Sequence, residues 1–242
     1  MIALFQSLFT PPRHMILLIL ALWAGLTLAE RRAERHSIPK EHLSNLVFYA
    51  CLAYILGGRL AFVLENLSVF AQSPFDILSL SPSIFDASGA ALAALLTSLI
   101  YAYRQKLPPW SLLDALTPVF GALAIGLGLS HLAAETAYGK LTGLPWGIEM
   151  RGATRHPSQI YETAASLLTF GLIWFKKADA RLGALFLTFA ALTAAARLFL
   201  EALRGDSAFI PGGFRLAQLI AWAALALCFI LYEYLQTRQP AK

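Results

Sequence analysis

The sequence predicts an all-α, polytopic membrane protein with seven transmembrane helices, on three observations. Of its 242 residues, 58% are apolar and only 14% are charged, whereas a soluble globular chain carries about 25% Asp, Glu, Lys and Arg. The mean hydropathy is +0.62. The apolar residues fall into blocks of about 15–25, which is the length that a helix needs to cross a bilayer. This composition excludes a disordered chain and a collagen-like fibre, and we expect one integral-membrane domain covering residues 1–242.

Seven apolar blocks define the expected helices, at about residues 15–29, 45–64, 87–103, 110–134, 157–175, 182–203 and 216–235. The first block is short, because about 15 residues rise about 22 Å against a hydrocarbon core of about 30 Å. We therefore expect Leu8 and Phe9 to complete its span. Its charged residues follow the apolar run, which favours a membrane span over a cleaved signal peptide. Pro118 predicts a kink in the fourth helix, and Pro157 suits the first turn of the fifth.

Lys and Arg are distributed unequally between the two sides of the membrane. Eleven lie on one side: Arg31, Arg32, Arg35, Lys40, Arg104, Lys106, Lys176, Lys177, Arg181, Arg238 and Lys242. Six lie on the other: Arg13, Lys140, Arg151, Arg155, Arg204 and Arg215. Because basic residues accumulate in cytoplasmic loops, the sequence predicts an outside N-terminus and a cytoplasmic C-terminus. The net charge of +5 then reflects topology and contact with membrane lipids, and it predicts no nucleic-acid partner.

Two of the predicted outer segments stand out. The segment 65–86 contains no Lys or Arg at all. The outer connection at about 135–156 contains the stretches LPWG and RGATRHP. At about 22 residues it is long for a loop, and long loops in compact domains are often functional.

Several predicted helices bring polar side chains to the outer half of the membrane. Arg59 and Arg197 lie about 21–22 Å from the cytoplasmic starts of their helices. Arg197, Glu201 and Arg204 are spaced by four and three residues, so they share one helix face. The other candidates lie near the outer ends of helices: His131, His156, Gln159, Tyr161, Glu162, Arg215 and Gln218.

Two interpretations of these arginines stay open. Charged residues inside a membrane helix are costly and usually face a partner or a functional site. The arginines are either paired structurally, Arg197 with Glu201 and Arg59 with Glu162 or Glu65, or they outnumber the nearby acids and bind an anion. In the outer leaflet that anion is a phospholipid phosphate, which the planar guanidinium holds as a fork.

Other chemistries are not indicated. The sequence has no metal-ligand spacing, no dinucleotide or phosphate-loop fingerprint and no G-x-S-x-G motif, so we expect no metal and no cofactor. Cys51 and Cys228 lie in apolar stretches without redox spacing, as small buried residues do. Asp114 and Glu135 suit helix caps or interfacial charges.

The segment His156–Glu162, HPSQIYE, resembles the H-P-S/T-Q-L/I-Y-E pattern of the prolipoprotein diacylglyceryl transferase family of bacterial inner membranes. Further similar segments follow the family's order. They are GGRLAFVLEN at Gly57–Asn66, YGKLTGLPWGI at Tyr138–Ile148, RLFLEALRGD at Arg197–Asp206, and the opening of the last helix at Phe214–Gln218. The resemblance covers most of the chain and implies a multi-pass protein of the inner membrane.

The resemblance implies transfer of a diacylglyceryl group from phosphatidylglycerol to the lipobox cysteine thiol in a prolipoprotein signal peptide, with release of glycerol phosphate. Arginines that hold the leaving phosphate stabilise the charge of the transition state, and a base deprotonates the thiol. It implies that Arg204 is catalytic and that the following residues bind lipid: Arg59, Gln159, Tyr161, Glu162, Arg197, Glu201, Arg215 and Gln218.

The chain departs from the family pattern at three places. The G-R-x-G signature falls on Leu127–His131, LGLSH, which puts Gly128 at the arginine; the histidine that opens the third helix falls on Ala87 or Ser88; and PPRHMILL lacks the tyrosine that enters the first helix. We therefore expect His131 or His156 to act as the base. His156 precedes Pro157, so its ring is also expected to cap the fifth helix, which leaves His131 slightly favoured.

Two further hypotheses remain beside the transferase. A non-catalytic homologue that binds anionic phospholipid is favoured by the missing signature arginine. A small transporter of anionic solutes is disfavoured, because the sequence has neither repeat symmetry nor paired discontinuous helices.

Overall fold

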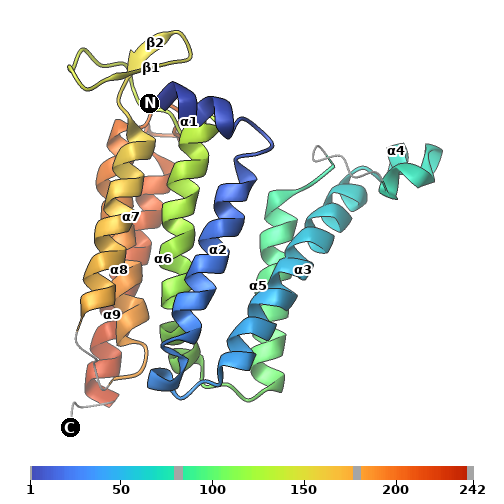
Figure 1. Ribbon diagram of the computed structural model, residues 1–242, viewed down its shortest axis with the longest axis vertical. Coiled ribbons are helices and arrows are strands. Elements are labelled where there is room, and N and C mark those ends of the chain that lie inside the picture. Colours follow the sequence, from blue (N-terminus) through green and yellow to red (C-terminus); the bar gives the residue numbers. More distant parts are fainter. Residues whose placement is uncertain (1, 79–83, 177–180, 239–242) are drawn as a thin grey trace. The chain divides into compact units, whose positions relative to one another are not determined.

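The structure is a computed structural model that describes residues 2–78, 84–176 and 181–238 (Figure 1). Helices make up most of it. Its elements in chain order are α1 (Ile2–Leu8), α2 (Met15–Glu30), η1 (Ala33–His36), α3 (Lys40–Glu65), α4 (Leu67–Gln72), η2 (Pro74–Leu78), α5 (Ala87–Arg104), α6 (Pro109–Ala133), β1 (Ile148–Met150), β2 (Ala153–Arg155), α7 (Ser158–Phe175), α8 (Ala184–Leu200), η3 (Glu201–Leu203) and α9 (Leu216–Arg238).

All seven predicted apolar blocks are helices, with boundaries that differ by a few residues. The largest difference is at α3, which begins at Lys40 because Pro39 has an extended backbone and precedes the first helical residue. Leu8 and Phe9 do not extend α2: residues 2–8 form the separate helix α1. The helix α6 continues through Pro118.

Among the described residues, four helices are long and apolar enough to cross a membrane: Lys40–Glu65, Pro109–Ala133, Ala184–Leu203 and Leu216–Arg238. The apolar helix Met15–Glu30 is shorter. Large apolar side chains also cover the outside of the helices, as Trp222 and Ile230 do on α9 at 64% and 63% exposure. A helix that is apolar on its exposed side is typical of contact with lipid.

The chain divides into two compact units. Unit 1 comprises Met1–Arg32 and Leu113–Lys242, and unit 2 comprises Ala33–Leu112. Unit 1 therefore contains α1, α2, nearly all of α6, the two strands and α7 to α9, whereas unit 2 contains α3, α4 and α5. The single domain predicted from the composition stays a prediction.

Within unit 1, α6 is the central helix. Glycines on its different faces allow neighbouring helices to pack closely against it. Gly126 lies against Ala21 of α2, and Gly121 lies against Phe170 of α7. A side chain at either glycine would collide with these neighbours. Figure 1 shows α6 between α2 on one side and α7 and α8 on the other. Small residues at such contacts let apolar helices approach closely in a membrane.

A buried carboxylate joins α6 to the start of α8. Asp114 is 3% exposed and accepts hydrogen bonds from the backbone N–H groups of Gly183 at 2.7 Å and Phe186 at 2.8 Å. Free N–H groups at a helix start need such an acceptor. The prediction that Asp114 serves as a cap is therefore confirmed, although the helix that it caps is α8.

The only strands in the described part of the chain form a hairpin, which the all-α prediction did not include. β1 and β2 pair antiparallel, with Glu149 opposite Thr154. Arg151 and Gly152 between them both have positive φ, at 52° and 72°, as the two central residues of a type I′ turn do. We call this end of unit 1, where α6 ends and α7 begins, the hairpin end.

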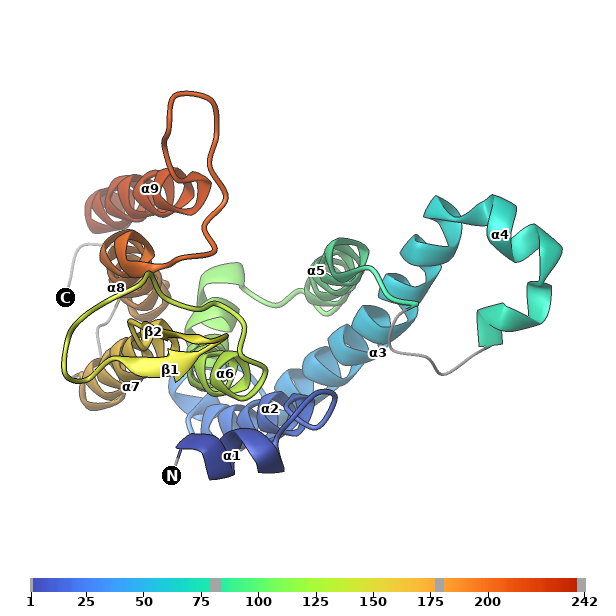
Figure 2. The same ribbon diagram turned by 90° about the horizontal axis from the view of Figure 1, so that it is seen from above.

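Two other segments lie at the hairpin end. The helix α1 is tied to α6 by Gln6 Nε2, which donates to the carbonyl oxygen of Leu132 at 3.2 Å. The segment between α8 and α9 projects as a loop (Figure 2). This loop turns back at Gly212 and Gly213, whose φ values of 97° and 78° favour glycine.

Candidate active site

Charged side chains from three helices meet at the hairpin end of unit 1. Glu162 of α7 is the shared partner, because its Oε1 accepts hydrogen bonds from Arg197 Nη1 at 2.8 Å and from Arg204 Nη1 at 3.1 Å. Arg197 Nη2 also lies 2.8 Å from Glu201 Oε2. The predicted structural pairing of Arg197 with Glu201 is thus confirmed, and α7 supplies a second carboxylate to the same guanidinium.

Asp206 adds a third carboxylate. Its two oxygens accept hydrogen bonds from Nε and Nη2 of Arg204, both at 2.9 Å, in the bidentate geometry that a guanidinium favours. Arg197 and Arg204 therefore face Glu162, Glu201 and Asp206. The predicted surplus of arginine over acid is not found in this cluster, because the chain turns after η3 and brings Asp206 back onto Arg204.

Arg204 is the most enclosed of the cationic side chains in this cluster, at 11% exposure. Burial by itself lowers the pKa of its guanidinium, but the hydrogen bonds to Asp206 and the charges of Glu162, Asp206 and Glu201 outweigh burial, so that the pKa is raised. The three carboxylates therefore favour the charged form of Arg204.

His131 at the end of α6 faces the same carboxylate. Its Nδ1 lies 3.7 Å from Glu162 Oε2, and its side chain is 27% exposed. This distance exceeds the ~2.7–3.2 Å of a hydrogen bond, but catalytic hydrogen bonds are often long before substrate binds. The sequence could not identify an acid partner for His131, and the structure places Glu162 there.

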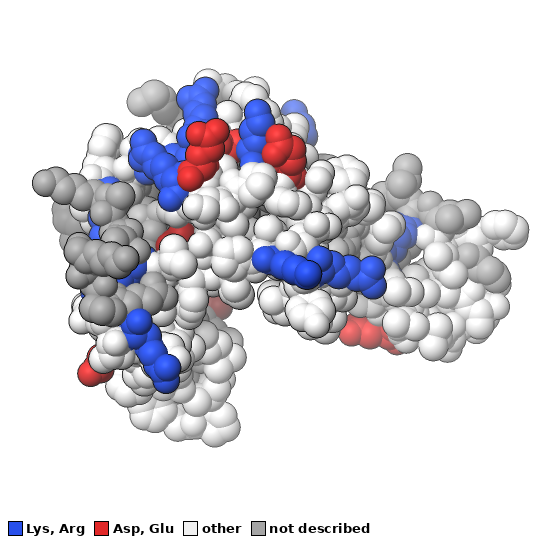
Figure 3. Space-filling view, turned by 90° about the horizontal axis from the view of Figure 1, so that it is seen from below, with Lys and Arg blue, Asp and Glu red and all other residues white. Residues whose placement is uncertain are grey.

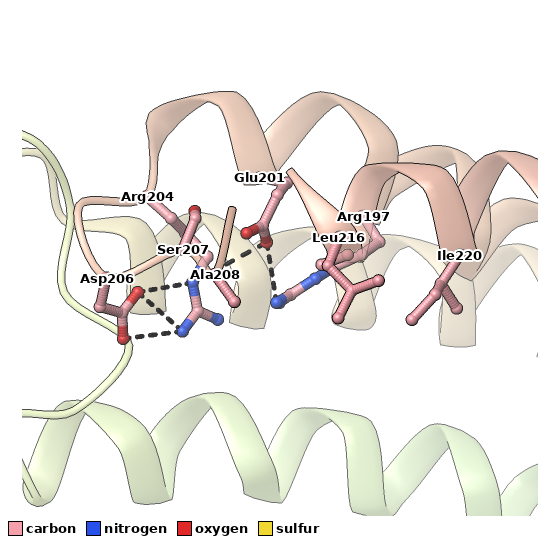
Figure 4. Close-up of a pocket in the computed structure, with 9 residues that line it drawn as sticks. Arg197, Glu201, Arg204, Asp206, Ser207, Ala208, Leu216 and Ile220 are labelled. Carbon is pink, nitrogen blue, oxygen red and sulfur yellow. Dashed lines mark hydrogen bonds and ion pairs between the residues drawn. The ribbon is translucent and has the colours of Figure 1, made fainter. Parts of the chain in front are cut away.

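A pocket of about 220 Å³ opens beside this cluster, between the end of α8 and the start of α9. Figure 4 shows Glu201 between the guanidinium groups of Arg197 and Arg204 on one side of the pocket. Its other side is formed by Ala208, Leu216, Ala217 and Ile220. The pocket thus combines two arginines, the carboxylates of Glu201 and Asp206, and an apolar wall.

Two of the predicted lipid-binding residues bond to the main chain instead. Arg215 Nη1 donates to the carbonyl oxygens of Glu201 at 2.7 Å and Arg204 at 3.0 Å, and it also contacts Ser207 Oγ. Gln218 Nε2 donates to the carbonyl oxygen of Leu198 at 3.0 Å. Both side chains hold the turn between α8 and α9, close to the pocket but outside its lining.

Gln159 and Tyr161 of α7 contact the connection 135–156. Gln159 is fully buried and donates from Nε2 to the carbonyl oxygen of Thr136 at 2.7 Å. The hydroxyl of Tyr161 accepts a hydrogen bond from Trp146 Nε1 at 2.9 Å. Their proximity in the sequence indicated one site, but they face a protein segment.

The predicted capping of α7 by the His156 ring is wrong. The N-cap residue is Pro157, and no side chain accepts a hydrogen bond there. The main chain of His156 is tied to the connection, because its N–H donates to the carbonyl oxygen of Lys140 at 2.9 Å. Its Cβ is consequently packed against Gly139, and its ring lies 6.3 Å from that of Tyr161. The buried Nδ1 of His156 has no hydrogen-bond partner among the described residues.

Arg59 is the one predicted site residue that belongs to unit 2. Its Nε donates to the carbonyl oxygen of Ile77 at 2.7 Å, which joins α3 to η2. Within unit 1, the structure brings together Arg197, Arg204, Glu162, Glu201 and His131.

Sequence reasoning did not assign Asp206 or the apolar wall from α9. Asp206 stands two residues after Arg204 and ends the segment RLFLEALRGD, so its position was a usable signal. The apolar wall depends on how α9 packs against α8, and no local sequence pattern predicts this packing. Within the described part of the chain, no group of three or more His, Cys, Asp or Glu residues is placed to hold a metal ion.

Comparisons with known proteins identify the family of the chain. A model of the prolipoprotein diacylglyceryl transferase family matches residues 11–234. The chain is 28% identical over 243 residues to the phosphatidylglycerol–prolipoprotein diacylglyceryl transferase of Nostoc sp., covering 93% of this chain and 85% of that protein.

Proteins with the same name from two other organisms show similar values. The Thermotoga maritima protein is 29% identical over 241 residues, covering 93% of this chain and 81% of its own length. The Clostridioides difficile protein is 28% identical over 230 residues, covering 92% of this chain and 90% of its own length. Because the family model spans nearly the whole chain, this membrane protein belongs to the prolipoprotein diacylglyceryl transferase family.

Proposed function

We propose that this chain transfers the diacylglyceryl group of phosphatidylglycerol to the lipobox cysteine thiol of prolipoproteins. The observation that carries the proposal is the pocket in which Arg197 and Arg204 face an apolar wall formed by Leu216 and Ile220. A phospholipid places an anionic phosphate directly beside apolar chains, and this pocket offers a partner to each. At about 220 Å³ it is smaller than the ~300–1,000 Å³ of drug-sized pockets, which suits a headgroup phosphate.

The reaction uses the arginines to stabilise a leaving group. The cysteine thiolate attacks the glyceryl carbon, a C–S bond forms, and the C–O bond to phosphate breaks. Glycerol phosphate leaves with the electron pair and gains negative charge. Arg204 directs three of its five N–H donors at Asp206 and Glu162, which leaves further donors for a phosphate oxygen. Such fixed donors act where charge develops in the transition state.

We assign the general base to His131. A carboxylate that faces one ring nitrogen orients the ring and stabilises its protonated form, as in hydrolytic triads. Glu162 Oε2 faces Nδ1 of His131 at 3.7 Å, so Nε2 is the nitrogen that accepts the thiol proton. His156, the alternative, has no ion pair with a described carboxylate and packs against Tyr161, which supports a structural role.

The membrane placement belongs to the same proposal. The helices at 15–30, 40–65, 87–104, 109–133, 158–175, 184–200 and 216–238 cross the bacterial inner membrane, with the N-terminus outside and the C-terminus in the cytoplasm. The eleven-to-six distribution of Lys and Arg supports this orientation. The hairpin end, and with it the pocket, then lies at the outer leaflet.

A non-catalytic phospholipid-binding homologue is the second candidate. Gly128, at the position that resembles the signature arginine, lies directly against Thr163 of α7, so that even a Cβ there collides with Thr163 Oγ1. The helices α6 and α7 therefore pack closely at the position where the family pattern has an arginine, and they leave no room for its side chain. This observation favours binding without transfer.

The experiment that separates these candidates measures transfer of labelled diacylglyceryl from phosphatidylglycerol vesicles to a lipobox peptide, with lipid binding measured in parallel. We expect the parent chain to be active. His131→Ala should lower kcat by about 100-fold or more, with little change in lipid affinity, because a general base contributes ~10²–10⁴-fold to the chemical step.

His156→Ala is the matched control, because it removes the other candidate ring at the same end of unit 1. It should lower the yield of folded protein while the purified fraction keeps its kcat. Full activity of His131→Ala would remove His131 from the mechanism. A parent that binds phosphatidylglycerol but transfers nothing would establish the non-catalytic homologue.

A further inference from the structure

The first turn of α7 carries two buried polar side chains that face the connection 135–156. Ser158 and Gln159 are 1% and 0% exposed. Ser158 Oγ donates to the carbonyl oxygen of Ala137 at 2.6 Å, and Gln159 Nε2 donates to that of Thr136 at 2.7 Å. A buried donor that is deprived of its acceptor is costly, so these two hydrogen bonds fix segment 136–137 on α7.

The backbone on either side of Thr136 is in a conformation that it would not adopt by itself. Glu135 and Ala137 have φ values of 52° and 55°, in the left-handed region that residues with a Cβ avoid. Such a conformation persists only where the surroundings hold it in place. The hydrogen bonds from Ser158 and Gln159 contribute to this, beside the bond from the Thr136 N–H to the carbonyl oxygen of His131 at 3.1 Å.

The same segment continues directly into the turn that carries Arg204. The N–H of Lys140 donates to the carbonyl oxygen of Leu203 at 2.9 Å, and the N–H of Gly205 donates to that of Tyr138 at 2.8 Å. Gly139 and Arg204 thus form an antiparallel bridge. The two backbones touch so closely that a Cβ on Gly205 would lie 2.7 Å from the oxygen of Gly139.

Arg204 is also held from its other side. Arg215 Nη1 donates to the carbonyl oxygen of Arg204 at 3.0 Å. The backbone of Arg204 therefore lies between Arg215 and segment 138–140, and its guanidinium is directed at Glu162 and Asp206. If segment 138–140 moves, Arg204 has to move with it.

We propose that Ser158 and Gln159 are positioning residues for Arg204, acting through segment 136–140. This inference rests on the proposed function, in which Arg204 binds a phosphate. The polar residues of the HPSQ stretch then contribute to transfer without touching the lipid. Their effect on the reaction passes through the orientation of one guanidinium, that of Arg204.

The test is a double-mutant cycle in the full-length protein, with transfer kinetics as the readout. Gln159→Leu removes the donor to Thr136 and keeps an apolar side chain of similar length. It should raise KM for phosphatidylglycerol and lower kcat, with kcat/KM falling about 30-fold. In an Arg204→Lys background, Gln159→Leu should lower kcat/KM by less than about threefold. The reason is that the effects of two residues are not additive when one acts through the other.

Thr163→Val is the matched control. Thr163 Oγ1 donates to the carbonyl oxygen of Gln159 within α7, so this variant removes a nearby hydroxyl without touching the connection. It should leave KM and kcat near those of the parent. Equal fold-losses from Gln159→Leu in both backgrounds would overturn the proposal, because a residue that only stabilises the fold acts additively.

Amide hydrogen exchange tests the positioning independently of any transfer activity. In Gln159→Leu, the N–H groups of Lys140 and Gly205 should exchange about tenfold faster than in the parent, and in Thr163→Val they should not. Unchanged protection of both amides in Gln159→Leu would overturn the proposal even in an active enzyme. A parent that neither binds phosphatidylglycerol nor transfers diacylglyceryl would instead contradict the proposed function, and the exchange result would still decide the positioning.

Discussion

Glu162 is the residue on which the charges of this site depend. It contacts Arg197, Arg204 and His131 within 3.7 Å, from positions 31 to 42 residues away in the sequence. Arg197 and Arg204 each keep a second carboxylate, Glu201 and Asp206 respectively. Removing the charge of Glu162 therefore leaves both arginines paired, whereas His131 loses the carboxylate that faces it.

We expect Glu162→Gln to lower kcat for transfer by roughly 10- to 100-fold, less than loss of the general base itself. Phosphatidylglycerol should bind as well as before or more tightly, because a negative charge near the phosphate is removed. Single-turnover transfer and equilibrium lipid binding measure the two effects separately.

Asp206→Asn is the matched control for this prediction. It weakens the hold on Arg204 but leaves the contact of His131 with Glu162 intact, so kcat should fall less than in Glu162→Gln. A Glu162→Gln enzyme with undiminished kcat, folded by its thermal transition, would show that Glu162 does not assist the base.

At the scale of elements, close helix contacts depend on glycine and alanine. In unit 2, Gly57 of α3 lies against Ala93 of α5, and Gly89 of α5 lies against Ala61 of α3. A Cβ at either glycine would collide with the alanine Cβ that faces it. These two contacts bring the helix backbones together and explain why α3 and α5 form one unit although both expose large apolar side chains.

We expect Gly57→Ala to destabilise the protein by about 1–3 kcal/mol, the usual cost of overpacking, even though alanine favours helix more than glycine does. Gly171→Ala in α7 is the matched control, because no atom lies within 4 Å of its added methyl group. It should stabilise by about 0.5–1 kcal/mol. Unfolding in detergent measures both changes, and equal effects of the two substitutions would show that the α3–α5 contact is looser than described.

At the scale of the whole molecule, both ends of the helices of unit 1 carry arginines over aromatic rings, as Arg155 lies over Tyr138 at 4.8 Å at the hairpin end. In unit 1, the end opposite the hairpin has Arg32 stacked on Trp174 at 3.3 Å from the ring centroid and Arg181 over Tyr232 at 5.4 Å. Figure 3 views the molecule from the lower end of Figure 1 and shows Lys and Arg at several places on that face, with Asp and Glu beside some of them. Arginines on aromatic rings suit a membrane–water interface.

Reporter fusions test the proposed orientation. Fusions after Lys106 and Lys177 should report a cytoplasmic location, and a fusion within 65–86 should report the outside, because Lys and Arg favour the cytoplasmic side. An outside signal from the Lys177 fusion would contradict the orientation and would move the pocket to the inner leaflet.

The sequence by itself determined the helices and the local part of the site. Apolar blocks of about 15–25 residues predicted α2, α3 and α5 to α9, because helix formation follows local composition. The spacing of Arg197, Glu201 and Arg204 predicted their shared face and the pairing of the first two, because neighbours on a helix surface are three or four residues apart.

Only the tertiary structure decided which groups meet across elements. Three such contacts join residues that are not related by the helical repeat. Glu162 contacts His131 and two arginines, Arg215 donates to main-chain carbonyl oxygens, and His156 packs against Gly139. The left-handed backbone at Glu135 and Ala137 is likewise held by hydrogen bonds from α7. The physical reason is that a periodic pattern records which face of a helix is apolar, whereas the partner of a polar side chain depends on how separate helices pack.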